Sequence, residues 1–231
     1  MNTFRIRYAA LPLALVLVLG MSQTGCSSMN RTGKGAVIGA GAGGVIGGVI
    51  GRATGSTARG AIIGAAVGGT AGAVIGRQMD KQAEELEGDL DNADVTPIPG
   101  ENGETAGIAV RFDNALLFDL GQATLRSGVQ ADLRDLAASL RNYPGHDAVI
   151  VGHASTDGST QLNQNLSDQR AQAVRNFLVG QGLASARLQA YGVGESEPLA
   201  GVPGTSPENR RVEIAIYPSE DYRQEVESQY N

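Results

Sequence analysis

The sequence predicts an α+β protein in which a two-layer α/β sandwich, with the element order β-α-β-α-β-β, follows a glycine-rich helical hairpin. Three observations lead to this fold class. Residues 1–79 contain no Asp or Glu, whereas all 24 acidic residues lie from Asp80 onward. Glycine recurs at every fourth position in two stretches of the first part. The second part alternates short apolar runs with stretches of helical periodicity.

The composition excludes several classes of function. The chain has 231 residues and a single cysteine, Cys26, so it can form neither an intrachain disulfide nor a cysteine-rich zinc site. Its two histidines, His146 and His153, offer little for metal chemistry, and we expect neither a metal nor a cofactor. The formal net charge of −6 argues against nucleic acid as a partner.

Residues 1–25 have the pattern of a secretory signal peptide. Arg5 and Arg7 precede an apolar run over residues 8–19, which is too short to be a good membrane-spanning helix. An uncleaved interfacial anchor is the alternative. The Thr-Gly-Cys sequence that ends at Cys26 resembles a bacterial lipobox, although Gln23 stands where an aliphatic residue is usual. The resemblance implies that Cys26 is diacylated, and the serines after it resemble a signal for sorting to the outer membrane.

Residues 26–79 hold two copies of a glycine repeat. Lys34–Arg52 and Arg59–Arg77 match at a fixed offset of 25 residues. On a helix, glycine at every fourth position forms a smooth stripe along which two backbones can approach closely. We expect two helices that turn back on each other through residues 53–58, and the pattern resembles the glycine-zipper domains of envelope proteins. Such a hairpin would lie in a membrane or form a homo-oligomer. The alternatives are a hairpin packed on the protein's own surface and a flexible tether.

Residues 80–106 are expected to form a spacer and a linker. Apolar residues recur at helical spacing from Met79 to Leu90, and acidic residues cover the other faces. This pattern predicts an amphipathic helix that leads away from the membrane. The prolines within residues 96–100 predict that the helix has ended and the linker has begun.

Residues 107–217 carry the signals of a folded domain, and both of its helices should cover one face of the sheet. The predicted elements, in order, are a strand over 108–112, a helix over 127–140, a strand over 148–151, a helix over 160–179 and strands over 188–191 and 212–217. Residues 218–231 are expected to be a polar tail.

Several motifs of this domain are specific when they are taken together and in order. They are Leu117-Phe118-Asp119; Gly152-His153 with Gly158; Asn163-x-x-Leu166-Ser167-x-x-Arg170-Ala171; Tyr191-Gly192-x-Gly194-Glu195-Ser196-x-Pro198; and Asn209-Arg210-Arg211-Val212-Glu213-Ile214. Over residues 107–217 the chain resembles the OmpA-like C-terminal domain, which is shared with peptidoglycan-associated lipoprotein and MotB. With the lipobox and the glycine repeat, it resembles outer-membrane lipoproteins of the YiaD type.

The resemblance implies a non-catalytic protein that is anchored in outer-membrane lipid and keeps its C-terminal domain in the periplasm. That domain would bind peptidoglycan non-covalently, through the diaminopimelate of the stem peptide, and so tie the membrane to the cell wall. The ligand-binding residues that the resemblance implies are Asp119, Ser155, Thr156, Asp157, Asn163, Arg170 and Arg211.

The residues themselves support part of this site. Asn163 and Arg170 lie seven positions apart and so share a helix face, and a guanidinium suits a carboxylate. For the ammonium of the ligand, the family has an Asp where this sequence has Ser155. Asp157 would lie on the same side of an extended segment, and we expect it to accept the ammonium instead. Alternatively, Asp157 caps the second helix, Arg170 forms a surface ion pair, and Arg211 pairs across the sheet.

The sequence also bears on two alternatives to a tether, an enzyme and a structural oligomer. His153, Ser155 and Asp157 alternate along one segment and would point the same way, which does not make a catalytic relay. The serious rival is a structural glycine-zipper oligomer whose folded domain binds another envelope protein or has lost its ligand.

Overall fold

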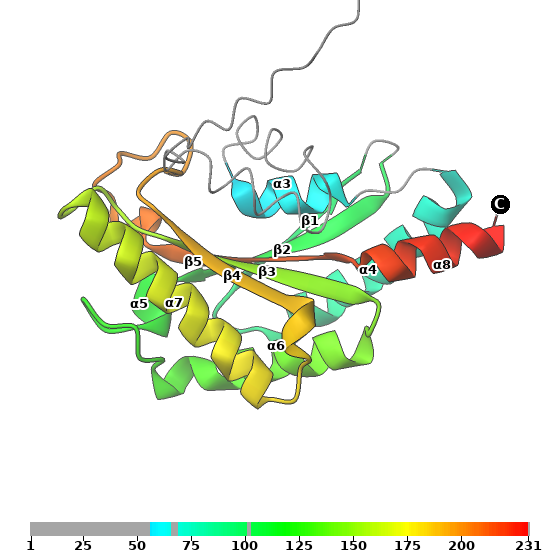
Figure 1. Ribbon diagram of the computed structural model, residues 1–231, viewed down its shortest axis with the longest axis horizontal. Helices are drawn as coiled ribbons and strands as arrows, with labels where there is room; N and C mark the ends of the chain where they lie inside the picture. Colours follow the sequence, from blue (N-terminus) through cyan, green and yellow to red (C-terminus); the bar gives the residue numbers. More distant parts are fainter. Residues whose placement is uncertain (1–55, 66–68, 101–102, 231) are drawn as a thin grey trace, which may run out of the picture.

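The computed structural model describes residues 56–65, 69–100 and 103–230, and its centre is a five-stranded sheet with the strand order β1-β2-β5-β3-β4 (Figure 1). The strands are β1 (Asp94–Pro99), β2 (Thr105–Asp113), β3 (His146–His153), β4 (Leu188–Gly194) and β5 (Arg211–Pro218). β3 and β4 pair in parallel, whereas the other three pairings are antiparallel. The signal peptide, Cys26 and the first glycine repeat lie outside the described residues.

The predicted order of strands and helices over residues 107–217 is confirmed. Helices α6 (Gln130–Asn142) and α7 (Thr160–Gly180) lie on the same face of the sheet, below it in Figure 1. Their buried leucines and valines pack against the strand residues that point to that face, which include Val110 and Ile214. Short helices fill the connections: α5 (Asn114–Leu117), η1 (Ser127–Val129), η2 (Ser185–Arg187) and η3 (Pro207–Asn209).

Helix α4 (Gly69–Asp89) differs from the expected spacer, because it is a third member of this helical layer. Met79 and Leu86, which the sequence analysis placed on an amphipathic helix, are fully buried in the main core. The buried side chain of Gln82 donates to Ser139 Oγ of α6 at 3.0 Å and lies 2.7 Å from His146 Nδ1 of β3. The helix therefore packs on the domain instead of leading away from it.

The second glycine repeat does not form one continuous helix. Helix α3 (Thr57–Gly64) ends before the repeat does, and α4 begins at Gly69, whose φ of +72° lies in the left-handed region. The two helices then lie on opposite faces of the sheet, with α3 above it in Figure 1. The described part of the second repeat thus packs on the folded domain, whereas the predicted hairpin includes the first repeat, which lies outside the described residues.

The face under α3, which we call the outer face, has its own small core. Ala58 and Ile62 of α3, and Ala65 directly after it, pack with strand residues that include Val151 and Tyr217. Gly107 makes this approach feasible, because a Cβ there would lie 2.6 Å from Ile62 Cγ2. Among the residues that the structure describes, no helix is both long and apolar enough to cross a membrane.

Two further elements appear where a linker and a tail were expected. β1 occupies residues of the predicted linker and pairs antiparallel with β2. Its prolines are compatible with this position because β1 is an edge strand, where a missing N–H costs little. The polar tail forms helix α8 (Glu220–Tyr230), which buries Val226 against the main core.

Candidate ligand-binding site

Helix α7 lies unusually close to β3 and β4, and this contact positions the predicted site. A Cβ on Gly152 would stand 2.3 Å from the carbonyl oxygen of Ser167, and one on Gly192 would stand 2.2 Å from Ser167 Oγ. Only glycine permits such a distance between a helix and a strand. Ser159 caps the helix by accepting a hydrogen bond from the Leu162 N–H at 3.2 Å. The face of α7 toward the sheet therefore carries Asn163, Ser167 and Arg170, all buried.

Arg170 is a buried cation that has no acidic partner among the residues the structure describes. Its side chain is 2% exposed, its Nε donates to the carbonyl of Gln122 at 2.9 Å, and its Cζ lies 5.4 Å from the centroid of the Phe118 ring. Within the described chain, no hydrogen bond or ion pair reaches its two terminal nitrogens. Burial, and then repulsion from Arg210, lowers the pKa of Arg170 to about 10, so the guanidinium still carries its charge at neutral pH.

The amide of Asn163 is oriented by two acceptors. Its Nδ2 donates to the carbonyl of Ser155 at 3.0 Å and to the Glu195 carboxylate at 2.6 Å. Because both acceptors are oxygens, the amide nitrogen must face them, and Oδ1 has no hydrogen bond within the described chain. Asn163 thus presents an acceptor to the site.

The loop after β3 brings Ser155 and Asp157 together with Arg210. Ser155 is buried and donates its hydroxyl to Asp157 Oδ2 at 3.1 Å. Arg210 Nη1 lies 3.3 Å from that same carboxylate oxygen and 3.3 Å from Ser155 Oγ. The neighbouring Thr156 is exposed, and its N–H donates to the carbonyl of Gly204 at 2.9 Å. Asp157 therefore supplies a carboxylate directly beside the residue that replaces the family's Asp.

Two of the predicted site residues pair with other charged side chains. Arg211 lies at the start of β5 and faces the outer side, because alternate strand residues point to opposite faces and Val212 belongs to the main core. Its Nε pairs at 2.7 Å with Glu213, which belongs to the same strand, and not with a residue across the sheet. Asp119 is exposed and lies 3.7 Å from Arg126 Nε. The structure thus places Arg211 on the face of the sheet opposite α7, whereas Asp119 directly follows Phe118 and stays a predicted site residue.

Four residues that shape the site were not among the predicted ligand-binding residues. Phe118, Glu195 and Arg210 stand within the motifs that carried the resemblance, so their place in a motif was the available signal. Gln122 contributes through its backbone carbonyl, which no side-chain pattern can reveal.

A second group of charged residues is buried under α3. His153 is fully buried, and burial lowers its pKa to about 3, against the opposing effect of Glu213. Burial would raise the pKa of Glu213, but His153, Arg211 and the Ser56 hydroxyl together lower it. Burial raises the pKa of Glu197, against the hydrogen bonds from Thr57. These groups are occupied by one another and by the start of α3.

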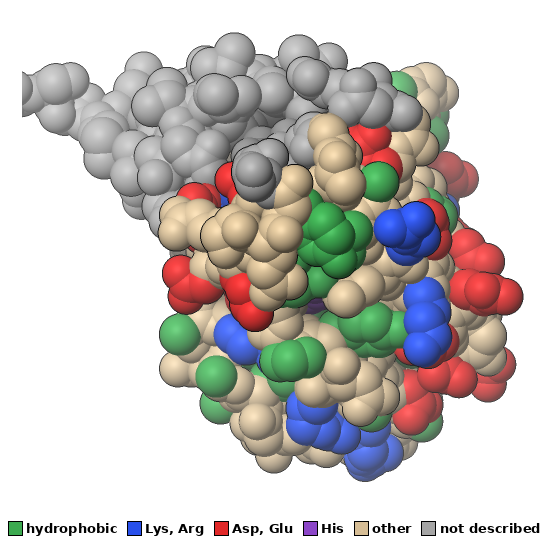
Figure 2. Space-filling model, turned by 90° about the vertical axis from the view of Figure 1, so that its right-hand side faces the viewer, with side chains coloured by type: hydrophobic (Ala, Val, Ile, Leu, Met, Phe, Trp, Pro, Cys, Tyr) green, Lys and Arg blue, Asp and Glu red, His purple; other side chains and the backbone are tan. Residues whose placement is uncertain are grey.

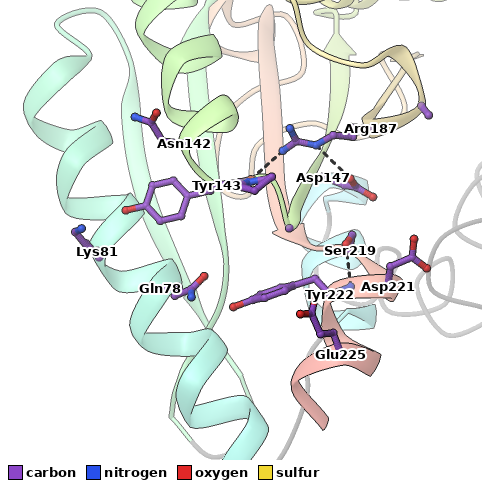
Figure 3. A pocket seen from close by; sticks show the side chains of 13 residues that line it. Gln78, Lys81, Asn142, Tyr143, Asp147, Arg187, Ser219, Asp221, Tyr222 and Glu225 are labelled. Atoms are coloured by element: carbon purple, nitrogen blue, oxygen red, sulfur yellow. Dashed lines mark hydrogen bonds and ion pairs between the residues drawn. The ribbon is translucent and has the colours of Figure 1, made fainter. Parts of the chain in front are cut away.

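A separate cavity of about 800 Å³ lies at the other end of the sheet, where β3 begins and β5 ends. Figure 2 views this end of the molecule and shows hydrophobic side chains near its middle and acidic ones crowding one edge. In Figure 3, Tyr143 and Tyr222 extend toward α4, which contributes Gln78 and Lys81. Arg187 does not serve as a free cation here, because it donates to the carbonyls of Leu140 and Tyr143, both at 2.9 Å.

Among the residues that the structure describes, no group of three or more His, Cys, Asp or Glu side chains could hold a metal ion.

Two protein families match parts of the chain. Residues 117–211 match the OmpA family, and residues 4–80 match the YMGG-like Gly-zipper. These matches confirm the resemblance that the motifs predicted.

Particular relatives agree with this resemblance. Outer membrane protein A of Klebsiella aerogenes is 37% identical over 117 residues, which are 49% of this chain and 33% of the relative. "Probable lipoprotein YiaD" of Escherichia coli strain K12 is 33% identical over 113 residues, which are 48% of this chain and 52% of the relative. The chain thus spans about half the length of the second relative and a third of the first.

The fold has a solved counterpart. A MotB-like protein from Desulfovibrio vulgaris superimposes with a TM-score of 0.52 at 22% identity, covering 62% of this chain and 92% of that one. At this identity the likeness concerns the fold alone, and it confirms the arrangement of the sheet and its helices.

Proposed function

We propose that this chain is a lipid-anchored outer-membrane protein whose OmpA-like domain binds peptidoglycan non-covalently through the diaminopimelate of the stem peptide. Acylation of Cys26 would hold one end in the outer membrane, and the domain would hold the cell wall from the periplasm. The protein acts as a tether and catalyses no reaction. The names of its relatives, an outer membrane protein and a lipoprotein, support a place in the envelope.

The observation that carries the proposal is the unpaired charge of Arg170. Burial of a cation without an anion costs free energy, and proteins usually supply a carboxylate partner. Here the buried guanidinium is held only by a carbonyl and an aromatic ring, and its terminal nitrogens have no partner in the described chain. A planar guanidinium with two free nitrogens matches the two oxygens of a ligand carboxylate.

A zwitterionic amino-acid centre also needs acceptors for its ammonium, and two are available. Asn163 presents Oδ1, because its amide nitrogen is engaged by Ser155 and Glu195. Asp157 adds a carboxylate that is hydrogen-bonded by Ser155 and paired with Arg210. This arrangement supports the hypothesis that Asp157 compensates for Ser155, with affinity reduced because Arg210 already neutralises part of its charge.

Sedimentation with diaminopimelate-type sacculi tests the proposal. The full chain in detergent should sediment with sacculi, and Arg170→Ala should lower the bound fraction at least about tenfold, because one charge-assisted carboxylate contact is removed. Arg170→Lys keeps the charge but loses the fork, so it should bind weakly.

The matched control is Arg134→Ala, because Arg134 is an exposed arginine of α6 that bonds Gln130 at 3.2 Å and lies away from the site. It should sediment like the parent chain. Equal sedimentation of the Arg170→Ala and Arg134→Ala variants, both folded by circular dichroism, would remove Arg170 from the binding site.

A further inference from the structure

We propose that docking of α3 on the outer face and ligand binding at the Arg170 site are coupled, through the segment 195–197 and the adjacent residues Arg210 and Arg211. The proposal rests on the proposed function, since it concerns the regulation of that site. Its physical basis is two pairs of nearby residues, Glu195 with Glu197 and Arg210 with Arg211. In each pair, the first residue contacts the ligand site, either α7 or the loop 154–159 (the ligand-site loop). The second residue is connected to the start of α3.

The segment 195–197 carries two carboxylates, one bonded to α7 and the other to the start of α3. The Glu195 carboxylate accepts from Asn163 Nδ2 at 2.6 Å and from Thr160 Oγ1 at 2.9 Å, both on α7. Two residues later, the Glu197 carboxylate accepts from the Thr57 N–H at 2.9 Å and from the Thr57 hydroxyl. A displacement of Glu197 therefore moves the residue that orients Asn163.

The adjacent arginines repeat this arrangement. Arg210 contacts Ser155 and Asp157 of the ligand-site loop, at 3.3 Å each. Arg211 pairs with Glu213 Oε1 at 2.7 Å, and the other oxygen of that carboxylate accepts from Ser56 Oγ at 2.7 Å. The backbone between the two arginines thus links the ligand-site loop to the start of α3.

The loop between these anchor points is held as one unit. Asn209 is 1% exposed, accepts from the Leu199 N–H at 2.8 Å and donates to the Pro203 carbonyl at 2.7 Å. Arg211 Nη2 lies 3.3 Å from the backbone oxygen of Glu197, which ties the two segments together. Because these side-chain hydrogen bonds hold the loop rigid, a displacement of the end bonded to α3 also displaces the end bonded to the ligand site.

Helix α3 is the element able to change state. It has eight residues, fewer than an isolated helix needs in water, so it is stable only while docked. Its apolar contacts come from Ala58, Ile62 and Ala65, and its first residues provide the polar ones. If α3 left the sheet, Glu197 would lose both Thr57 donors and become hydrated, which would shift the segment 195–197. The glycine-rich region could in this way loosen or tighten the grip on the ligand.

The first test removes one contact of the link. Thr57→Val preserves the side-chain shape but lacks the hydroxyl that bonds Glu197. Titration of the full chain in detergent micelles with a soluble diaminopimelate-containing muropeptide should show affinity weakened about fivefold or more, the range of typical coupling energies. Thr70→Val is the matched control, because Thr70 is exposed on α4, and it should bind like the parent chain. Ile62→Ala, which weakens docking through packing alone, should resemble Thr57→Val.

The second test reads the link in the opposite direction, since coupling is reciprocal. Saturating muropeptide should slow hydrogen exchange at the α3 amides of the parent chain. Without any ligand, Arg210→Gln should accelerate exchange at the same amides, because it releases the other end of the link.

The outcomes separate the two proposals. If the parent chain binds no muropeptide, the proposed function fails, and the ligand-free exchange of Arg210→Gln alone decides whether the link exists. If the parent chain binds, but Thr57→Val and Ile62→Ala bind equally well and the α3 amides do not respond to ligand, the coupling is overturned. A weaker Thr57→Val variant with an unaffected Thr70→Val variant supports it.

Discussion

Arg170 and Arg211 are nearly equally buried, yet within the described part of the chain only Arg211 has an acidic partner. Arg211 has Glu213 at 2.7 Å, whereas Arg170 has a carbonyl and an aromatic ring. The motifs placed both arginines in one site. The alternation of side chains along a strand separates them. Val212 points to the main core, so Arg211 must point to the opposite face of β5. At the scale of single residues, the sequence thus identified the chemical groups but could not assign each group to a face.

His146 is a buried residue with a consequence for pH. Its Nδ1 lies 2.7 Å from Gln82 Oε1, its ring stacks on Tyr143, and its Nε2 has no partner in the described chain. Burial, and then the charge of Arg187, lowers its pKa to about 4. The unfolded chain therefore takes up this proton first, at a pKa near 6.5.

We expect the free energy of unfolding to fall as the pH is lowered from about 6.5 toward 4, by as much as about 3 kcal/mol from this residue. His146→Asn can still donate to Gln82 but does not titrate, so its stability should depend less on pH over this window. Urea unfolding at several pH values measures the difference. The same pH slope in the variant and in the parent chain would show that His146 does not titrate as described.

At the scale of elements, the sequence located every strand and both long helices of residues 107–217. It did not predict that α4 packs in the main core or that β1 joins the sheet. The periodicity of α4 was visible, and its apolar face could have met a membrane-proximal surface or a core. The pairing of β1 was hidden by its prolines, because their position at the sheet edge is a property of the assembled sheet. Local sequence patterns predict that a helix or strand forms, whereas the neighbouring elements in the fold decide where it packs.

The setting of α4 leads to a stability prediction. Leu86 is fully buried in the main core, so Leu86→Ala should lower the free energy of unfolding by about 2–5 kcal/mol. The adjacent exposed Glu87 supplies the control, and Glu87→Ala should change stability by less than about 0.5 kcal/mol. Chemical denaturation of the full chain measures both. A solvated spacer would instead make the two substitutions equally harmless.

For the whole molecule, the division of charge separates two environments. The first 79 residues have seven Lys or Arg and no acid, whereas the rest has 24 acids and 11 Lys or Arg. The acidic part contains the folded domain, and the basic part contains the expected anchor. Excess negative charge on the domain disfavours its binding to anionic surfaces.

The anchor itself is open to a direct test. Cys26→Ser should abolish incorporation of a labelled fatty acid and release the protein from the membrane fraction, because acyl chains provide the attachment. The neighbouring Ser27→Ala is the control and should remain labelled. Labelling of the Cys26→Ser variant at the level of the parent chain would contradict the lipid anchor.

The sequence by itself determined the class of the domain, the order of its elements and the residue types of the site, because periodicity and motif spacing are local properties. The tertiary structure alone decided that α3 and α4 divide over two faces of one sheet, that Arg211 is turned away from the site and that Glu195 orients Asn163. These facts depend on contacts between segments far apart in the chain. Such contacts follow from the way strands pair and helices pack, which local patterns do not encode.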